Sequence, residues 1–204
     1  MHDVGIYENL ILGIHFLLLK KCKIFDEKTI VRCYTGRSMR INVRKHERRG
    51  YQSIKMSNIL EKQFLKQRND FEKSCVERDK KYHFPQGVIF ETDIAYAKDK
   101  NKAHRLDRYR PKGKETQILP VIINVHGGGL LLGNKEFNKY FCALLSKKGF
   151  LVYSMEYRLI PDCTFFDQLR DIFLAMDFVK EHAAADGGDL SHVYLVGDSG
   201  GACL

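Results

Sequence analysis

The chain has 204 residues, of which 44% are hydrophobic and 11% aromatic. This length suits one ordinary domain with a core, and the composition excludes a disordered chain. The formal net charge of +9 is uneven, because residues 1–55 hold 12 Lys and Arg against 5 Asp and Glu, which leaves 22 against 20 for residues 56–204.

Residues 1–55 are therefore predicted to be a basic N-terminal extension, and one hypothesis is that Met56 is the natural start. A basic run at residues 37–50 suits phosphate or an anionic membrane surface, but such runs are more often only solvated. The apolar stretch Leu10–Leu19 is half of the roughly 20 residues that a membrane-spanning helix needs. Because acidic residues precede it and lysines follow it, we expect neither a signal peptide nor stable membrane insertion, and a weak membrane anchor stays open.

Six cysteines are scattered along the chain without a Cys-x-x-Cys pair or a histidine at zinc-finger spacing. Free thiols in a reducing compartment are the simplest interpretation, which predicts a cytoplasmic protein. No metal and no cofactor are predicted.

From Met56 onward the pattern becomes regular. Ser57 or Asn58 is placed to cap a helix, and the apolar spacing predicts that helix over residues 57–73. Val88–Ala97 alternates as a half-buried strand does, with one face predicted to carry Val88, Phe90, Thr92, Ile94 and Tyr96. A shorter strand follows and ends at Pro111, so these two strands are expected to form an antiparallel pair.

The next segments alternate between strand and helix. Residues 118–126 are apolar on both faces apart from Asn124, which is typical of a strand covered by helices on each side. Helices are predicted over residues 136–149 and 165–183, and strands over residues 150–155 and 192–197. Short links between them predict right-handed crossovers and an α/β fold.

The chemistry of the chain centres on Ser199, which lies in Gly197-Asp198-Ser199-Gly200-Gly201. Trypsin-like proteases carry the same five letters, but they are all-β, and Ala202 stands where their pattern has proline. The alternative is the Gly-x-Ser-x-Gly elbow between a strand and a helix, which presents a nucleophilic hydroxyl above the sheet. The predicted helices favour the elbow over the protease.

A second glycine cluster, Gly127-Gly128-Gly129, follows His126 directly after the buried strand. Backbone amides must come close to the oxyanion that forms when a serine attacks an ester, and glycines permit that approach. By position, Gly127 and Gly128 are predicted to donate to the oxyanion together with Gly200.

With these motifs the chain resembles the hormone-sensitive-lipase-like branch of the α/β-hydrolases from about Val88 onward. The resemblance rests on HGGG at 126–129, EYRLIPD at 156–162 and GDSGG at 197–201, in the family's order. It implies a partial α/β-hydrolase with a mostly parallel sheet and flanking helices. It also implies a serine carboxylic-ester hydrolase, similar to esterases and lipases, that acts on a small-molecule ester.

The resemblance implies a role for each motif residue. Ser199 would be the nucleophile, and His126 with Gly129 would support the oxyanion loop without acting as a base. Asp198 would pack at the elbow, and polar contacts beside the loop would come from Glu156, Arg158 and Asp162. Two acidic residues of the following helix are expected to be ordinary surface carboxylates, namely Asp171 and Asp177. Leu130 replaces an aromatic residue that the family often has after HGGG.

The family's triad continues with an acid and a histidine after the serine, whereas only five residues follow Ser199 here. We therefore expect residues 56–204 to be an incomplete domain with its later strands and helices missing. Neither triad acid nor base is predicted in the chain, so it is expected to be inactive alone and to self-associate through an exposed sheet edge.

Two other functions stay open. The first is a non-catalytic α/β-hydrolase relative that uses the HGGG cleft to bind a small acyl or carbonyl ligand. The second is a protein that acts on nucleic acid or membrane through its basic tail, although no nucleic-acid partner is expected.

Overall fold

The computed structural model describes residues 58–204 and three short strands before them, β1 (Lys20–Lys21), β2 (Ile30–Arg32) and β3 (Ser38–Arg40). Strands β2 and β3 form an antiparallel pair. Most of the predicted extension at residues 1–55 lies outside the described residues, as does the apolar stretch Leu10–Leu19. The division of the chain at residue 56 therefore stays a prediction.

The core is a mixed sheet with strand order β1-β8-β6-β7-β5-β4. Its main strands are β4 (Val88–Ala95), β5 (Arg105–Pro111), β6 (Leu119–Val125), β7 (Leu151–Met155) and β8 (Gly188–Gly197). Strand β6 pairs in parallel with both β7 and β8, whereas β4, β5 and β1 join by antiparallel pairing. The predicted α/β class is confirmed, but the sheet is mixed instead of mostly parallel, because parallel pairing is confined to β6 and its two neighbours.

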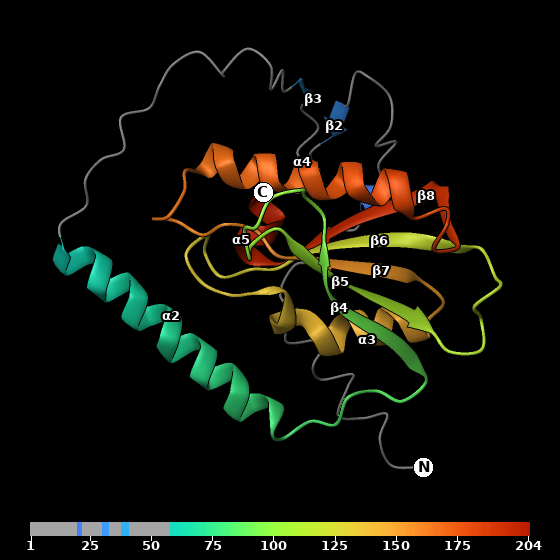
Figure 1. Cartoon of the computed structure of the whole chain (residues 1–204), viewed down its shortest axis with the longest axis horizontal. Coiled ribbons are helices and arrows are strands. Elements are labelled where there is room, and N and C mark those ends of the chain that lie inside the picture. Colours follow the sequence, from blue (N-terminus) through green and yellow to red (C-terminus); the bar gives the residue numbers. More distant parts are fainter. Residues whose placement is uncertain (1–19, 22–29, 33–37, 41–57) are drawn as a thin grey trace.

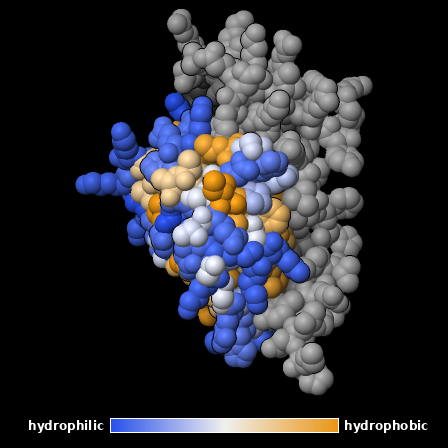
Figure 2. All heavy atoms as spheres, turned by 90° about the vertical axis from the view of Figure 1, so that its right-hand side faces the viewer, coloured by the Kyte–Doolittle hydropathy of each residue, from blue (hydrophilic) through white to orange (hydrophobic). Residues whose placement is uncertain are grey.

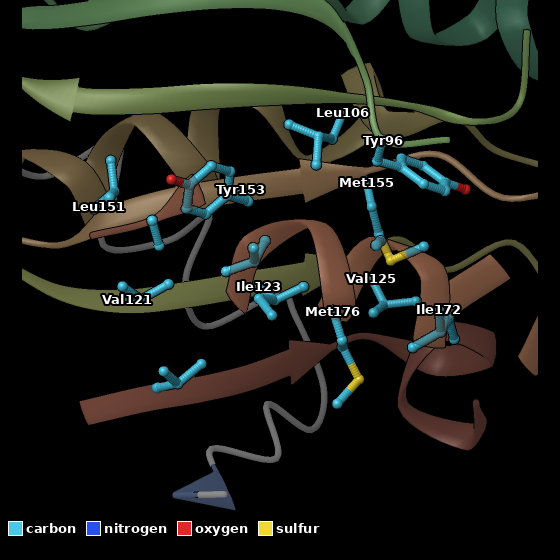
Figure 3. Packing of buried hydrophobic residues seen from close by; sticks show 14 of the residues in the cluster. Tyr96, Leu106, Val121, Ile123, Val125, Leu151, Tyr153, Met155, Ile172 and Met176 are labelled. Atoms are coloured by element: carbon cyan, nitrogen blue, oxygen red, sulfur yellow. The ribbon is translucent and has the colours of Figure 1, made fainter. Parts of the chain in front are cut away.

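Two helices cover opposite faces of this sheet, α3 (Lys139–Lys147) and α4 (Phe165–His182) (Figure 1). On the α4 side, Val121, Ile123 and Val125 of β6 pack with Ile172 and Met176 (Figure 3). On the α3 side, the main contacts of β6 come from Ile122, which lies in a second apolar cluster. The prediction of a strand covered on both sides is thus confirmed, and each fully buried aliphatic side chain contributes about 1.5–3 kcal/mol.

Local signals set the ends of α4. Thr164 caps its start, because its side chain accepts from the amide of Asp167 while the Asp167 carboxylate accepts from the Thr164 amide. After the helix, the Gly188 amide donates to Ala183 O at 2.6 Å, and β8 begins there. The strand is thus four residues longer at its start than predicted, because Gly188 already pairs with Leu119 of β6.

Helix α2 (Asn58–Asp79) begins where predicted and continues past residue 73, since residues 74–79 contain neither glycine nor proline. It lies apart from the sheet (Figure 1). Its contacts include the ring of Phe71 against that of Phe137, with centroids 5.2 Å apart, and an ion pair between Asp79 and Lys139.

The prediction that β4 carries one apolar face is wrong. The ladder with β5 shifts register between Glu91 and Ile94, where Asp93 has a φ of 59°. This bulge inserts residues into one strand and turns the later residues of that strand to the other face. Phe90 consequently packs in the cluster under α3, whereas Ile94 packs in the cluster under α4.

Over the described part of the chain, we find no helix that combines the length and apolarity needed to cross a membrane. Four cysteines in that part are free thiols: Cys75, Cys142, Cys163 and Cys203. The cytoplasmic location stays a prediction.

Candidate active site

Ser199 lies on a strand-to-helix elbow, because β8 ends at Gly197 and helix α5 (Ser199–Cys203) begins two residues later. Its φ of 46° is a conformation that costs a non-glycine residue about 1–3 kcal/mol. Gly197 and Gly201 flank the serine at positions where a side chain would not fit. A Cβ on Gly201 would lie 2.2 Å from Val125 O, and one on Gly197 would lie 2.6 Å from the Gly201 carbonyl carbon.

The HGGG segment lies directly against this elbow. A Cβ on Gly200 would come within 3.0 Å of the amide nitrogens of both Gly129 and Leu130. The two glycine clusters, far apart in sequence, therefore meet at the carboxyl ends of the neighbouring strands β6 and β8. This is the edge at which ligands bind in open α/β sheets.

Asp198 joins the loop to the elbow and corrects one sequence-based expectation. Its Oδ1 accepts from the Gly127 amide at 3.0 Å and from Asn138 Nδ2 at 2.8 Å. The Gly127 amide is thus already used by Asp198, which argues against its predicted role as an oxyanion donor. Within the described residues, the amides of Gly128, Gly129 and Gly200 have no hydrogen-bond acceptor.

His126 is fully buried, and both of its ring nitrogens are occupied. Nδ1 lies 2.8 Å from Gly127 O, and Nε2 lies 2.9 Å from Glu156 Oε1. Burial by itself would lower the pKa of His126, but the hydrogen bond and charge of Glu156 outweigh it and raise the pKa above its ordinary value. Both ring nitrogens are therefore engaged with acceptors beside the loop, which suits a supporting role for His126 instead of that of a base.

Glu156 clamps both ends of the loop. While Oε1 accepts from His126, Oε2 accepts from the Lys135 amide at 3.0 Å. Tyr157 adds a second brace, since its ring stacks on that of His126 with centroids 4.3 Å apart and its hydroxyl donates to His126 O at 2.8 Å. The predicted polar contact from Glu156 is confirmed.

Asp171 is not a surface carboxylate, which corrects the prediction for this residue. It is completely buried, accepts from Arg158 Nη2 at 2.7 Å, and lies 3.0 Å from His104 Nε2. Asp177 is exposed, as expected. The signal that could have separated the two is helical spacing, because position 171 lies three residues after buried Gln168 and four before buried Ala175.

Two further residues near the loop escaped the sequence analysis. The side chain of Lys135 is buried, with Nζ 3.0 Å from both Asp107 Oδ1 and Asp93 Oδ1. Arg68 of α2 donates to Leu131 O at 2.9 Å and pairs with Asp162 at 2.7 Å. The burial and ion pairing of such a lysine or arginine cannot be predicted from its neighbours in sequence, because its partners are far away in the chain.

Comparison with known proteins identifies relatives of this site. A family model described as BD-FAE matches residues 106–204. Among curated proteins, a probable isoprenylcysteine alpha-carbonyl methylesterase from Oryza sativa subsp. japonica is 36% identical over 99 residues, which cover 48% of this chain and 23% of that protein. A versiconal hemiacetal acetate esterase from Dothistroma septosporum is 31% identical over 97 residues, which cover 47% of this chain and 29% of that protein.

Solved esterases share the fold. Esterase B from Lactobacillus rhamnosis superposes with a TM-score of 0.62 and 31% identity, covering 69% of this chain and 47% of that one. This chain is therefore similar to esterases of the α/β-hydrolase fold. An esterase from Pyrobaculum calidifontis superposes with a TM-score of 0.56 and 26% identity, covering 74% of this chain and 46% of that one. This α/β-hydrolase chain thus spans about a quarter of the length of the curated relatives and about half that of the solved esterases.

A cavity of about 350 Å³ lies far from the elbow, at the edge of the sheet where β5 ends and β8 begins. Its arginines are already engaged, because Arg108 pairs with Glu91 and Asp186 and Arg110 donates to the carbonyl of Asp186. Hydrophobic side chains on the face that Figure 2 shows lie in separate areas among hydrophilic ones. We therefore place the candidate site at Ser199.

Proposed function

We propose that this chain carries the nucleophile and the oxyanion-binding half of a serine hydrolase that acts on carboxylic esters. Ser199 attacks the ester carbonyl, the bond from the carbonyl carbon to the alkoxy oxygen breaks, the alcohol leaves with the serine proton, and an acyl-enzyme remains. The observation that carries the proposal is the packing of the Gly129 and Leu130 amides against Gly200, beside the serine. The similarity of the chain to esterases supports the same reaction class.

In this proposal the oxyanion is bound by the amides of Gly128, Gly129 and Gly200. Gly129 takes the place of Gly127, which the sequence position suggested, because the Gly127 amide is held by Asp198. A Cβ on Gly128 would lie 2.0 Å from Leu132 O, so the bend has no room for a side chain. Each donor in such a site lowers the barrier by about 2.7–4 kcal/mol.

The proposal does not assign a general base within these 204 residues. Among the described histidines, none has a ring nitrogen hydrogen bonded to Ser199, and the rings of His104 and His126 are held by carboxylates. A serine hydroxyl without an adjacent base is a weak nucleophile near neutral pH. We expect the 204-residue chain to hydrolyse p-nitrophenyl acetate no faster than its Ser199→Ala variant, and serine-dependent turnover would contradict this part.

The ester is proposed to be small on one side of the carbonyl. One relative is named a methylesterase, another is named an acetate esterase, and esterase B was solved with a tributyrin phosphonate. In each name the ester has a short acyl or alkoxy part.

The test uses the protein isolated from its native cells. A fluorophosphonate probe reacts only with an activated serine, so we expect the labelled peptide to contain Ser199 and the Ser199→Ala variant to remain unlabelled. A protein that carries the residue but is not labelled would instead be the non-catalytic relative that binds a small acyl or carbonyl ligand. The absence of a histidine on Ser199 among the described residues is the observation that favours this second candidate.

A further inference from the structure

Gln168 occupies an unusual position on α4. The residue is fully buried on the helix face that otherwise carries Ile172, Ala175 and Met176. Its Nε2 donates at 2.9 Å to Leu130 O and at 2.9 Å to Arg158 O, so one amide group joins the glycine loop to the YRLIPD segment. Its Oε1 is buried and has no partner among the described residues.

The loop end that Gln168 holds is in a constrained conformation. Leu130 has a φ of 70°, which L side chains rarely adopt. Its carbonyl accepts from Ile160 N at 3.0 Å as well as from Gln168. Because φ and ψ of Leu130 together set the angle between its amide and its carbonyl, holding the carbonyl restrains the direction of the amide, which lies beside Gly200.

We propose that Gln168 is a positioning residue that holds Leu130 in its left-handed conformation and thereby fixes the glycine loop whose Gly128 and Gly129 amides are proposed to bind the oxyanion beside Ser199. This inference rests on the proposed function for its catalytic consequence. The orphaned Oε1 supports it, because an apolar side chain at this buried position would avoid an unsatisfied acceptor. A glutamine at this position supplies an NH₂ group, whose two hydrogens donate to Leu130 O and Arg158 O.

The first arm of the test measures the loop in the 204-residue chain without using activity. Gln168→Met keeps the side-chain volume and removes both hydrogen bonds. We expect the strong intraresidue amide-to-Hα NOE of Leu130, a sign of positive φ, to weaken, and the Ile160 amide, which donates to Leu130 O, to exchange at least about tenfold faster. Val179→Ala is the control, because it loosens the core at the far end of α4 without touching the loop. An unchanged Leu130 in Gln168→Met overturns the proposal.

The second arm measures turnover of p-nitrophenyl acetate by the natural protein that labels at Ser199. We expect Gln168→Met to lower kcat about 10- to 100-fold with little change in KM, because a misplaced oxyanion loop affects the transition state more than substrate binding. In a Leu130→Gly background, Gln168→Met should lower kcat by a clearly smaller factor, since glycine adopts positive φ freely. An equal loss in both backgrounds, or a loss matched by Val179→Ala, would contradict the inference.

The two arms separate failure of the inference from failure of the proposed function. If Ser199 is never labelled but Leu130 moves in Gln168→Met, the positioning contact is real and the hydrolase proposal fails. If Ser199 is labelled and Gln168→Met keeps both its NOE and its kcat, the hydrolase proposal stands and Gln168 does not position the loop.

Discussion

At the scale of single residues, the site depends on carboxylates that hold backbone rather than react. Asp198 accepts from the Gly127 amide, and Glu156 accepts from the Lys135 amide and from His126. Each carboxylate therefore ties one end of the glycine loop to a fixed part of the sheet. Charge-assisted hydrogen bonds of this kind are stronger than neutral ones, which suits a loop whose amides must stay in place.

The His126–Glu156 pair predicts a pH dependence of stability. The folded pKa of His126 is raised, so the pair's contribution is fully present below the unfolded pKa of about 6.5 and is lost as pH rises through the folded pKa. We expect Glu156→Gln to lower the free energy of unfolding most at about pH 6 and less at about pH 9. Urea unfolding of both proteins at each pH measures this. A difference that grows with pH would have the wrong sign.

Asp171 and Asp177 provide a matched pair on one helix. Asp171→Asn removes a buried charge that faces Arg158 and His104, and we expect a loss of about 3–5 kcal/mol in unfolding free energy. Asp177→Asn changes an exposed carboxylate and should stay within about 0.5 kcal/mol. Chemical denaturation distinguishes the two variants. Equal effects would mean that the buried network does not contribute to stability.

At the scale of elements, periodicity predicts the helices and strands that carry the site. The strand before His126 and the strand before Ser199 are recognisable because their residues are apolar on both faces or bounded by glycine. The β4 bulge is not predictable in this way, since Asp93 with a φ of 59° leaves no mark on an alternating pattern. Which loop amides are free depends on the contact between Gly127 and Asp198, which are far apart in the chain.

Arg68 connects helix α2 to the loops beside the site, because it donates to the carbonyls of Leu131 and Ile160 and pairs with Asp162. We expect Arg68→Met to speed amide exchange throughout α2 by about tenfold or more while leaving the sheet protected, because local elements open independently of the core. Hydrogen exchange followed by mass spectrometry measures this. Lys66→Met is the control, since Lys66 lies on the same helix and is exposed. Equal exchange in both variants would mean that the contacts of Arg68 do not hold α2 in place.

At the scale of the whole molecule, the sheet brings together residues that are about seventy positions apart, because parallel strands end at the same edge. Ile122 and Tyr194 pair in register, and the same ladder continues to Val125 and Gly197. The register therefore places the start of the glycine loop, after Val125, next to the start of the serine elbow, after Gly197. A general sequence pattern predicts that the two motifs meet, whereas the direction of each amide depends on side chains such as Gln168.

The outer edge of β8 leads to a prediction about association. Its inner edge pairs with β6 on both sides of an irregularity between Asp189 and Val193, but the outer edge pairs with β1 only at Tyr194 and Leu195 among the described residues. Exposed strand edges recruit other strands, so we expect the 204-residue chain to form dimers or larger species at about 100 µM. Light scattering after size exclusion measures the mass.

A charge placed on that edge should reduce the association, because lysine on an edge strand opposes pairing. Ser191→Lys introduces it on the exposed part of β8, and Ser74→Lys makes the same change on exposed α2 as a control. We expect only the first substitution to shift the population toward monomer. If the unmodified chain is already monomeric, the open edge is covered from within the chain. If both substitutions act equally, association depends on net charge instead of strand pairing.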